Sequence, residues 1–327
     1  NEADFSDDFS FYINTWSDAN TPPYITLNQA DGKEVRVLEN NAALVARLKE
    51  YKMNKIEFFT FTTPETNLPD GKHVELNAWR ILPYDFDSTK KYPVVLVVYG
   101  GPGRQEVMNA WASTDINCFW CEMMAEQGYL IVSVDPRGTD ARGQEFKKMT
   151  YMELGKYETV DFIETAKYLS ALGYVDPDKI GIVGWSYGGY MALNAITQGA
   201  DYFNAAIAVA PVTNWRYYDN IYTERFMRTP QENPNGFDKN SPIFHVDKLK
   251  GNLLLVHGGA DDNVHPQNTI DMITALVNAN KQFDMFIYPN KNHGISGGNT
   301  RYHLYKKMTD FLDLHLLDKK DMNGNEK

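Results

Sequence analysis

Three residues of this chain have the types and spacing that nucleophilic catalysis requires, and the first of them is a serine. Ser186 lies within Gly184-Trp185-Ser186-Tyr187-Gly188-Gly189, after the apolar run Ile180–Val183 and before a helical segment that begins near Tyr190. A Gly-x-Ser-x-Gly turn between a strand and a helix lifts the serine hydroxyl above a sheet, and the start of the helix favours a developing negative charge. We therefore predict that Ser186 is a nucleophile.

An acid and a base follow Ser186 in the chain order of such a triad, each beyond a later apolar run. Asp261 and Asp262 come after Leu253–Val256, and from the pattern alone either carboxylate suits the acid. His293 comes after Met285–Tyr288 and is the best placed of the seven histidines; surface or packing roles suit the other six, including His257. We predict that His293 takes the proton of Ser186 and that an aspartate fixes the imidazole tautomer.

The tetrahedral intermediate of this chemistry carries a negative charge that needs hydrogen-bond donors. One donor is expected from the backbone N–H of Tyr187, the residue after the nucleophile. The other is expected from Tyr99-Gly100-Gly101-Pro102-Gly103, a loop after the run Val94–Tyr99, where the phenol of Tyr99 can donate directly. Tyr99 and Tyr187 are thus the predicted oxyanion hole.

Alternating strand and helix patterns must position these residues. A strand pair, Glu57–Thr62 and Val74–Leu82, leads into repeated apolar runs that are typical of strands buried on both faces. The pattern predicts an α/β fold of the α/β-hydrolase type, a mostly parallel sheet covered by helices on both faces. The expected strands are Val94–Tyr99, Tyr129–Val134, Ile180–Val183, Ala205–Val209, Leu253–Val256 and Met285–Tyr288, and the expected helices are Thr159–Leu172, Tyr190–Gln198, Gln267–Asn280 and Tyr302–Leu316.

The first part of the chain has a different pattern. Residues 1–40 alternate apolar and polar side chains around turn signals, which predicts a three-stranded antiparallel meander, and a linker helix is expected within 41–55. Three strands cannot bury two faces alone, so we expect the last blade of a β-propeller, followed by the catalytic domain at 56–318 and a polar tail at 319–327. Because the chain begins at Asn1 without a signal segment, we expect a fragment or a processed product.

Composition and missing motifs exclude several classes of function. The net charge of −11, with no run of Lys or Arg, argues against nucleic acid as a partner. The apolar runs are far shorter than the ~20 residues that cross a bilayer, so no membrane span is expected in this chain. No metal-binding or nucleotide-binding motif occurs, so we expect no metal and no cofactor. Cys118 and Cys121 are the only cysteines, and packing within a helix suits them better than redox chemistry.

Several segments together are similar to one family. Besides the segments around Ser186, Tyr99 and Asp261, they include Asp135-Pro136-Arg137-Gly138 and the stretch from Ala210 to Arg225. From about residue 40 to the last helix, the chain resembles the prolyl oligopeptidase family of serine peptidases, and most closely its dipeptidyl peptidase members. The resemblance implies that Asp261, rather than Asp262, is the acid.

The resemblance also implies a substrate pocket and an activity. It makes Asn263 a contact of the substrate carbonyl, and it surrounds the residue before the cleaved bond with Tyr187, Val212, Trp215, Tyr218, Tyr222 and Val264. The flat ring of proline suits such aromatic faces. The implied activity is that of a serine exopeptidase that releases dipeptides after a penultimate proline or alanine. A tripeptidyl peptidase or another member of the family is the alternative, ahead of an esterase or lipase and of an inert interaction module.

Other expectations come from the family alone. Its members usually carry a β-propeller over the hydrolase, and the residues that hold the amino terminus of the substrate belong to that propeller, outside this chain. The resemblance further implies peptide substrates with proline at the second position, a homodimer formed near Tyr302–Leu316, and a periplasmic or extracellular location.

Overall fold

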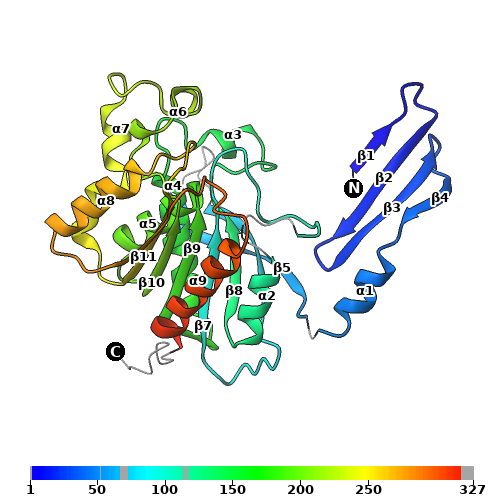
Figure 1. Cartoon of the computed structure of the whole chain (residues 1–327), viewed down its shortest axis with the longest axis horizontal. Coiled ribbons are helices and arrows are strands. Elements are labelled where there is room, and N and C mark those ends of the chain that lie inside the picture. The colour runs from blue at the N-terminus through cyan, green and yellow to red at the C-terminus, as the bar shows by residue number, and fades with distance from the viewer. Residues whose placement is uncertain (1, 52, 67–72, 113–115, 117, 318–327) are drawn as a thin grey trace.

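A large sheet and a small sheet organise the chain in the computed structural model, which describes residues 2–51, 53–66, 73–112, 116 and 118–317. The large sheet has eight strands, and the small, antiparallel one has four and stands apart from it (Figure 1). Helix α1, Ala42–Leu48, lies between the two sheets along the chain. The described helices include none with the length and apolar character needed to cross a membrane.

The large sheet has the strand order β12-β11-β10-β9-β7-β8-β6-β5. Six neighbouring strands, from β12 to β8 in this order, run parallel, whereas β6 is antiparallel to both β5 and β8. This arrangement confirms the predicted α/β fold with a mostly parallel sheet. The strands are β5 (Ile56–Thr66), β6 (His73–Ile81), β7 (Tyr92–Val98), β8 (Leu130–Asp135), β9 (Val175–Trp185), β10 (Ala205–Val209), β11 (Asn252–Gly258) and β12 (Asp284–Tyr288).

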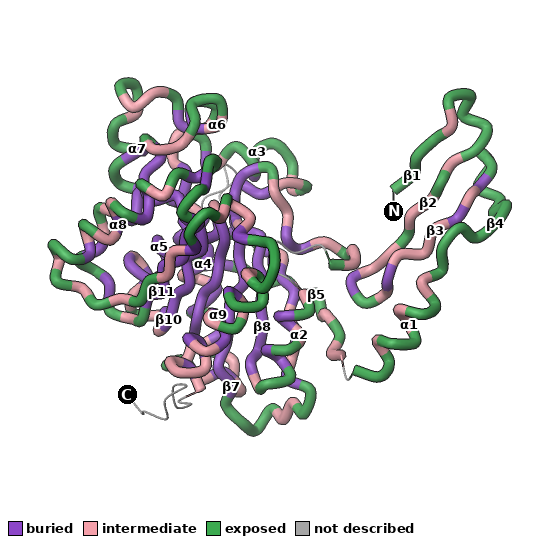
Figure 2. Tube along the Cα trace, in the orientation of Figure 1, coloured by how far each residue is buried: buried purple, intermediate pink, exposed green. Residues whose placement is uncertain are grey.

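Helices cover the two faces of this sheet and explain why its central strands are apolar throughout. On one face Phe162 of α4, Met191 of α5 and Met272 of α8 belong to one buried cluster. On the other face Trp120 of α2 and Leu312 of α9 belong to a second. Figure 2 shows the buried residues concentrated in this layered body. The helices are α2 (Cys118–Glu126), α3 (Gln144–Lys148), α4 (Lys156–Ser170), α5 (Tyr187–Gln198), α6 (Asn220–Met227), α7 (Pro234–Lys239), α8 (Gln267–Asn278) and α9 (Thr300–Leu316).

One helix start differs from the sequence-based expectation. Helix α5 begins at Tyr187, directly after Ser186, rather than near Tyr190, because tertiary contacts hold Gly188 and Gly189 in a helix that their low propensity disfavours. Cys118 and Cys121 both lie in α2, as expected, and Cys121 is buried. The helix of residues 41–55 is also shorter than expected: α1 has no buried residue, and a helix without packing is marginal at this length.

The small sheet has one strand more than predicted. Its strands follow the chain order β1 (Glu2–Phe5), β2 (Phe11–Asp18), β3 (Thr21–Gln29) and β4 (Glu34–Glu39). All four residues of β1 are exposed and lack the alternation that would have predicted a strand. The turn between β2 and β3 reaches the large body, where the Ile56 N–H donates to Asn20 Oδ1 at 2.8 Å and the Ala19 N–H donates to Asn109 Oδ1 at 3.0 Å.

Candidate active site

The register of the central strands brings the three predicted triad residues to one edge of the sheet. Val209 of β10 pairs with Trp185 of β9 on one side and with Val256 of β11 on the other, and Gly258 of β11 pairs with Tyr288 of β12. Because these strands are parallel and in step, the residues that follow them emerge together. Ser186, Asp261 and His293 are among those residues, at the carboxyl ends of the strands, which is the edge where open α/β sheets usually bind their ligands.

Ser186 has a strained backbone, with φ 59° and ψ −116°. A non-glycine residue in such a region costs about 1–3 kcal/mol and is held only by its surroundings. Here the Ser186 N–H donates to the Val209 carbonyl at 2.8 Å, and the Ser186 carbonyl accepts from the Tyr190 N–H at 3.0 Å. Ser186 is partly exposed between buried neighbours, so the turn presents its hydroxyl at the surface of the site.

The glycines beside Ser186 are required by close backbone contacts. A Cβ atom on Gly184 would lie 2.1 Å from the carbonyl oxygen of Gly188, and a Cβ atom on Gly188 would lie 2.2 Å from that of Val98. Neither backbone can retreat without moving β7 or α5. The Gly-x-Ser-x-Gly pattern thus reflects three elements, β7, β9 and α5, that meet at Ser186.

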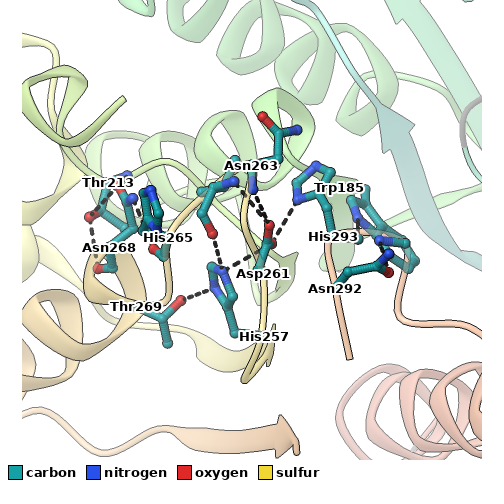
Figure 3. A network of polar contacts seen from close by, with 12 residues as sticks. Trp185, Thr213, His257, Asp261, Asn263, His265, Asn268, Thr269, Asn292 and His293 are labelled. Carbon is teal, nitrogen blue, oxygen red and sulfur yellow. Dashed lines mark hydrogen bonds and ion pairs between the residues drawn. The ribbon is translucent and has the colours of Figure 1, made fainter. Parts of the chain in front are cut away.

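Asp261 contacts His293 directly: Nδ1 of the imidazole lies 2.8 Å from Oδ2 of the carboxylate (Figure 3). The other oxygen, Oδ1, accepts from the N–H groups of Asn263 and Val264, each at 3.0 Å. Burial by itself raises the pKa of Asp261, but hydrogen bonds from His257 and His293 outweigh it and hold that pKa well below its ordinary value. Asp261 is buried and Asp262 is exposed, so of the two candidates the structure places Asp261 against the histidine.

The loop that carries His293 is tied to the strand that carries Ser186. The indole N–H of Trp185 donates to the His293 carbonyl at 3.0 Å. In the described part of the chain, no hydrogen bond joins the side chains of Ser186 and His293, and catalytic contacts of this kind are often long until substrate binds. The arrangement supports general-base activation of a serine.

The two predicted oxyanion donors come from neighbouring strands. Tyr99 directly follows β7, Tyr187 begins α5 after β9, and β7 and β9 are adjacent. Their rings lie 5.9 Å apart between centroids, and the guanidinium carbon of Arg104 lies 5.6 Å from the Tyr99 ring centroid. The backbone N–H of Tyr187 is at the first turn of α5, where helix N–H groups lack intrahelical partners.

The predicted pocket residues form a connected set of aromatic rings. Trp215 is the centre, with ring centroids at 5.4 Å from Tyr187, 5.7 Å from Tyr222 and 5.9 Å from Tyr218. Val212 and Val264 are buried in the same apolar cluster. The Tyr218 hydroxyl donates to Asn263 Oδ1 at 2.8 Å, which joins the aromatic set to the loop of Asp261.

Capping side chains shape the segment that carries these rings. Asn214 accepts from the Arg216 N–H at 2.9 Å and opens the short 3₁₀ turn Trp215–Tyr217. Asp219 accepts from the Tyr222 N–H at 2.9 Å and begins α6. Two short helical turns in succession therefore direct Trp215 and Tyr222 toward one another.

A buried carboxylate that the sequence pattern did not predict lies behind the aromatic set. Glu158, in the first turn of α4, is fully buried, and its Oε1 accepts from the Tyr187 hydroxyl at 2.7 Å. Burial is the main cause that raises the pKa of Glu158 to about 7. Nothing in the local pattern distinguishes Glu158 from a solvent-facing glutamate at a helix start. Among the described residues, no group of three or more His, Cys, Asp and Glu side chains is arranged to hold a metal ion.

Comparison with known proteins gives consistent matches across the chain. The family model of the prolyl oligopeptidase family matches residues 117–319. Prolyl endopeptidase FAP of Mus musculus is 40% identical over 299 residues, which are 89% of this chain and 37% of the relative. Probable dipeptidyl-aminopeptidase B of Paracoccidioides brasiliensis is 40% identical over 279 residues, which are 84% of this chain and 29% of the relative.

A solved structure agrees over nearly the whole chain. Dipeptidyl peptidase 4 of Porphyromonas gingivalis superposes with a TM-score of 0.91 at 48% identity, covering 96% of this chain and 43% of that one. The chain described here thus spans less than half the length of each of these relatives.

Proposed function

This chain belongs to the prolyl oligopeptidase family, as its sequence motifs predicted, and from that premise we propose that it is the catalytic part of a serine peptidase that releases dipeptides after a penultimate proline or alanine. The observation that carries the proposal is the 2.8 Å contact between Asp261 and His293 at the sheet edge where the strained Ser186 stands. The dipeptidyl peptidase relatives support the dipeptide product.

The reaction follows from the roles that these groups can take. Nε2 of His293 removes the proton of Ser186 as Oγ attacks the carbonyl carbon of the substrate, and Asp261 stabilises the imidazolium that forms. The Tyr187 N–H and the Tyr99 hydroxyl donate to the oxyanion. The imidazolium returns its proton to the leaving amine, which departs and leaves an acyl-enzyme. Water, activated by His293, then releases the dipeptide and restores Ser186.

The aromatic set explains a preference for proline before the cleaved bond. Tyr187, Trp215, Tyr218 and Tyr222 offer ring faces, and Val212 and Val264 complete an apolar wall. A proline ring buries its methylene groups against such faces and brings no N–H that would need a partner there. Alanine fits with less contact. Asn263 supplies an amide for the substrate carbonyl.

Besides dipeptide release, two other kinds of cleavage are candidates within the family. The murine relative is named an endopeptidase, so cleavage within a longer peptide is a second candidate, and tripeptide release is a third. The groups that would recognise a free amino terminus lie, in our proposal, in a propeller whose last blade is formed by residues 1–40. That assignment is supported by the four antiparallel strands, whose exposed apolar side chains include Phe11, Trp16 and Val37. Apolar side chains grouped in this way are usually covered by a neighbouring part of the protein, as the next blade of a propeller would cover them.

The proposal is tested with chromogenic Gly-Pro and Ala-Pro amides and with an amino-blocked Gly-Pro amide. The assay compares this chain, the natural full-length protein and a Ser186→Ala variant of each. We expect the full-length protein to cleave the free-amino substrates, to ignore the blocked one and to lose all activity in the variant. Cleavage of the blocked amide would show endopeptidase activity, and cleavage by Ser186→Ala would refute the assignment of the nucleophile.

The proposal also includes a homodimer that uses the surface of α9 and an exported, periplasmic or extracellular location, both of which rest on the family resemblance. Tyr302 of α9 is 75% exposed, which suits a surface that another subunit covers. Light scattering of the full-length protein tests the dimer, for which a monomeric mass would be the contrary result. Cell fractionation tests the location.

A further inference from the structure

A second histidine lies directly behind Asp261, and the mechanism above does not use it. His257, near the end of β11, has no exposed side-chain surface. Its Nδ1 lies 2.7 Å from the Thr269 hydroxyl, and its Nε2 lies 2.8 Å from the Val264 carbonyl and 3.3 Å from Asp261 Oδ2 (Figure 3). Both ring nitrogens are therefore engaged, one of them on two acceptors.

These partners determine which nitrogen of His257 carries a proton. The Val264 carbonyl can only accept, so Nε2 must carry a hydrogen and donate it. In the neutral ring Nδ1 is then an acceptor, and the Thr269 hydroxyl donates to it. The Nε2–H group lies between the Val264 carbonyl and the Asp261 carboxylate, so a donor faces Oδ2 whatever the charge of the ring.

The four donors on Asp261 differ in where they come from. Oδ1 receives two backbone N–H groups from Asn263 and Val264, which belong to the same loop as Asp261 and move with it. Oδ2 accepts a hydrogen bond from Nδ1 of His293, a side chain that must itself be held in the right orientation. Among the four, His257 is the donor that stands on a strand of the sheet, and Thr269 in α8 holds its ring from the other side.

We propose that His257 is a positioning residue that holds Oδ2 of Asp261 in line with Nδ1 of His293. The inference rests on the proposed function, because it assigns His257 a part in that catalysis. The competing explanation is that His257 only closes the loop through its bond to Val264. A positioning role affects kcat and the pH dependence of the triad, whereas a loop-closing role affects stability alone.

Two amide substitutions separate these explanations. In His257→Gln the side-chain amide reaches the place of Nε2 and keeps a donor to Val264 and Asp261. In His257→Asn the amide reaches only the place of Nδ1, so it can bond Thr269 but neither Val264 nor Asp261. If His257 only closes the loop, this variant should melt at a lower temperature but label at the wild-type rate; if His257 positions Asp261, its labelling should also slow. Both variants are neutral and polar and differ mainly in the position of the donor. Thermal melting establishes that each is folded before its reactivity is measured.

The reactivity of Ser186 is measured as its rate of labelling by a fluorophosphonate across a pH series, with the full-length protein. We expect His257→Gln to label within about threefold of the wild type. We expect His257→Asn to label about tenfold to a hundredfold more slowly, the loss of one hydrogen bond to a charged group. Its acid limb should move to higher pH, because the charge of Asp261 then acts on His293 alone.

The possible outcomes are distinct. Equal rates and equal pH profiles for a folded His257→Asn and the wild type would overturn the inference and leave the triad intact. A folded His257→Gln that labels tenfold or more slowly than the wild type would also overturn it, even if His257→Asn does not fold. A wild type that is not labelled would overturn the proposed function, and with it the inference.

Discussion

The indole N–H of Trp185 donates to the backbone carbonyl of His293 at 3.0 Å, and Trp185 is the residue next to Ser186. One side chain therefore connects the strand that bears the serine with the loop that bears the histidine. The guanidinium group of Arg301, in α9, packs over the same indole ring, with its carbon 4.8 Å from the ring centroid. The distance between Ser186 and His293 thus depends on the hydrogen bond from the Trp185 indole to the His293 backbone, in which neither the Ser186 nor the His293 side chain takes part.

Trp185→Phe is expected to reduce kcat by roughly threefold to tenfold, the effect of one neutral hydrogen bond, with little change in KM. The ring remains, but the loop of His293 loses its tie to β9. Steady-state kinetics with a Gly-Pro amide measure both constants. Trp120→Phe is the matched control, because the Trp120 indole donates to Thr309 between α2 and α9, so it should lower stability without lowering kcat. A change in KM alone for Trp185→Phe would contradict the prediction.

Gly188→Ala is expected to destabilise the protein by about 3 kcal/mol or more, because the added Cβ meets the Val98 carbonyl at 2.2 Å, where the backbone cannot yield. The midpoint of denaturant unfolding measures the change. Gly173→Ala is the control: a Cβ there meets no atom within 4 Å, and the substitution should be nearly neutral. Equal midpoints for the two variants would show that the turn at Ser186 has more room than the structure gives it.

Tyr222→Leu is expected to raise KM for Gly-Pro amides by roughly fivefold to tenfold and to narrow the preference for proline over alanine. The reason is that the ring of Tyr222 stacks on Trp215 at 5.7 Å and offers a face to the predicted pocket. Phe226→Leu is the control. It removes a ring one turn along α6 whose centroid lies 4.8 Å from that of Tyr222 and which is not predicted to line the pocket. An unchanged ratio of proline to alanine cleavage in Tyr222→Leu would argue against this pocket.

The buried Glu158 predicts a pH dependence of stability. Burial raises its pKa from an ordinary 4.5 to about 7, so the folded chain binds the proton more tightly than the unfolded chain does. The resulting stabilisation is complete below about pH 4.5 and is lost as pH rises to about 7, by roughly 3 kcal/mol in total.

Glu158→Gln removes this titration, and a matched substitution isolates it. Unfolding free energies of Glu158→Gln and the wild type should diverge between pH 4.5 and 7, with the variant gaining relative stability as pH rises. Other buried carboxyls such as Asp135, whose pKa burial raises to about 6, titrate alike in both proteins and cancel. Glu145→Gln, on the surface of α3, should follow the wild type throughout. Parallel curves for Glu158→Gln and the wild type would contradict the assignment.

Much of the central sheet could be predicted from the sequence, because strands buried on both faces are apolar without interruption. The run Ala205–Val209 coincides with β10, and Ser186 stands between a strand and a helix as its glycines indicated. Elements that lack such a signal were missed or misjudged. The exposed strand β1 has no alternation, and α1 ends early because no packing supports it.

The contacts behind the site could not be predicted, because they join residues that are distant in the chain and ordinary in their local pattern. His257 directly follows an apolar run, and this position indicates no more than a packing role. Its contact with Asp261 depends on how the following loop turns back. Glu158 and Tyr187 are 29 positions apart in the chain, and they meet only because α4 packs against α5. Residues that follow strand ends are predictable from periodicity, whereas their supporting residues depend on the packing of the layers.

Whether Ser186, His293 and Asp261 act as one unit is measured most directly by fluorophosphonate labelling, with the modified peptide identified by mass spectrometry. Asp261→Asn and Asp262→Asn form a matched pair of neighbouring substitutions. We predict that the label is on Ser186, that Asp262→Asn reacts like the wild type, and that Asp261→Asn reacts roughly 10³-fold to 10⁴-fold more slowly. A label on another residue, or a fast Asp261→Asn beside a slow Asp262→Asn, would contradict the account.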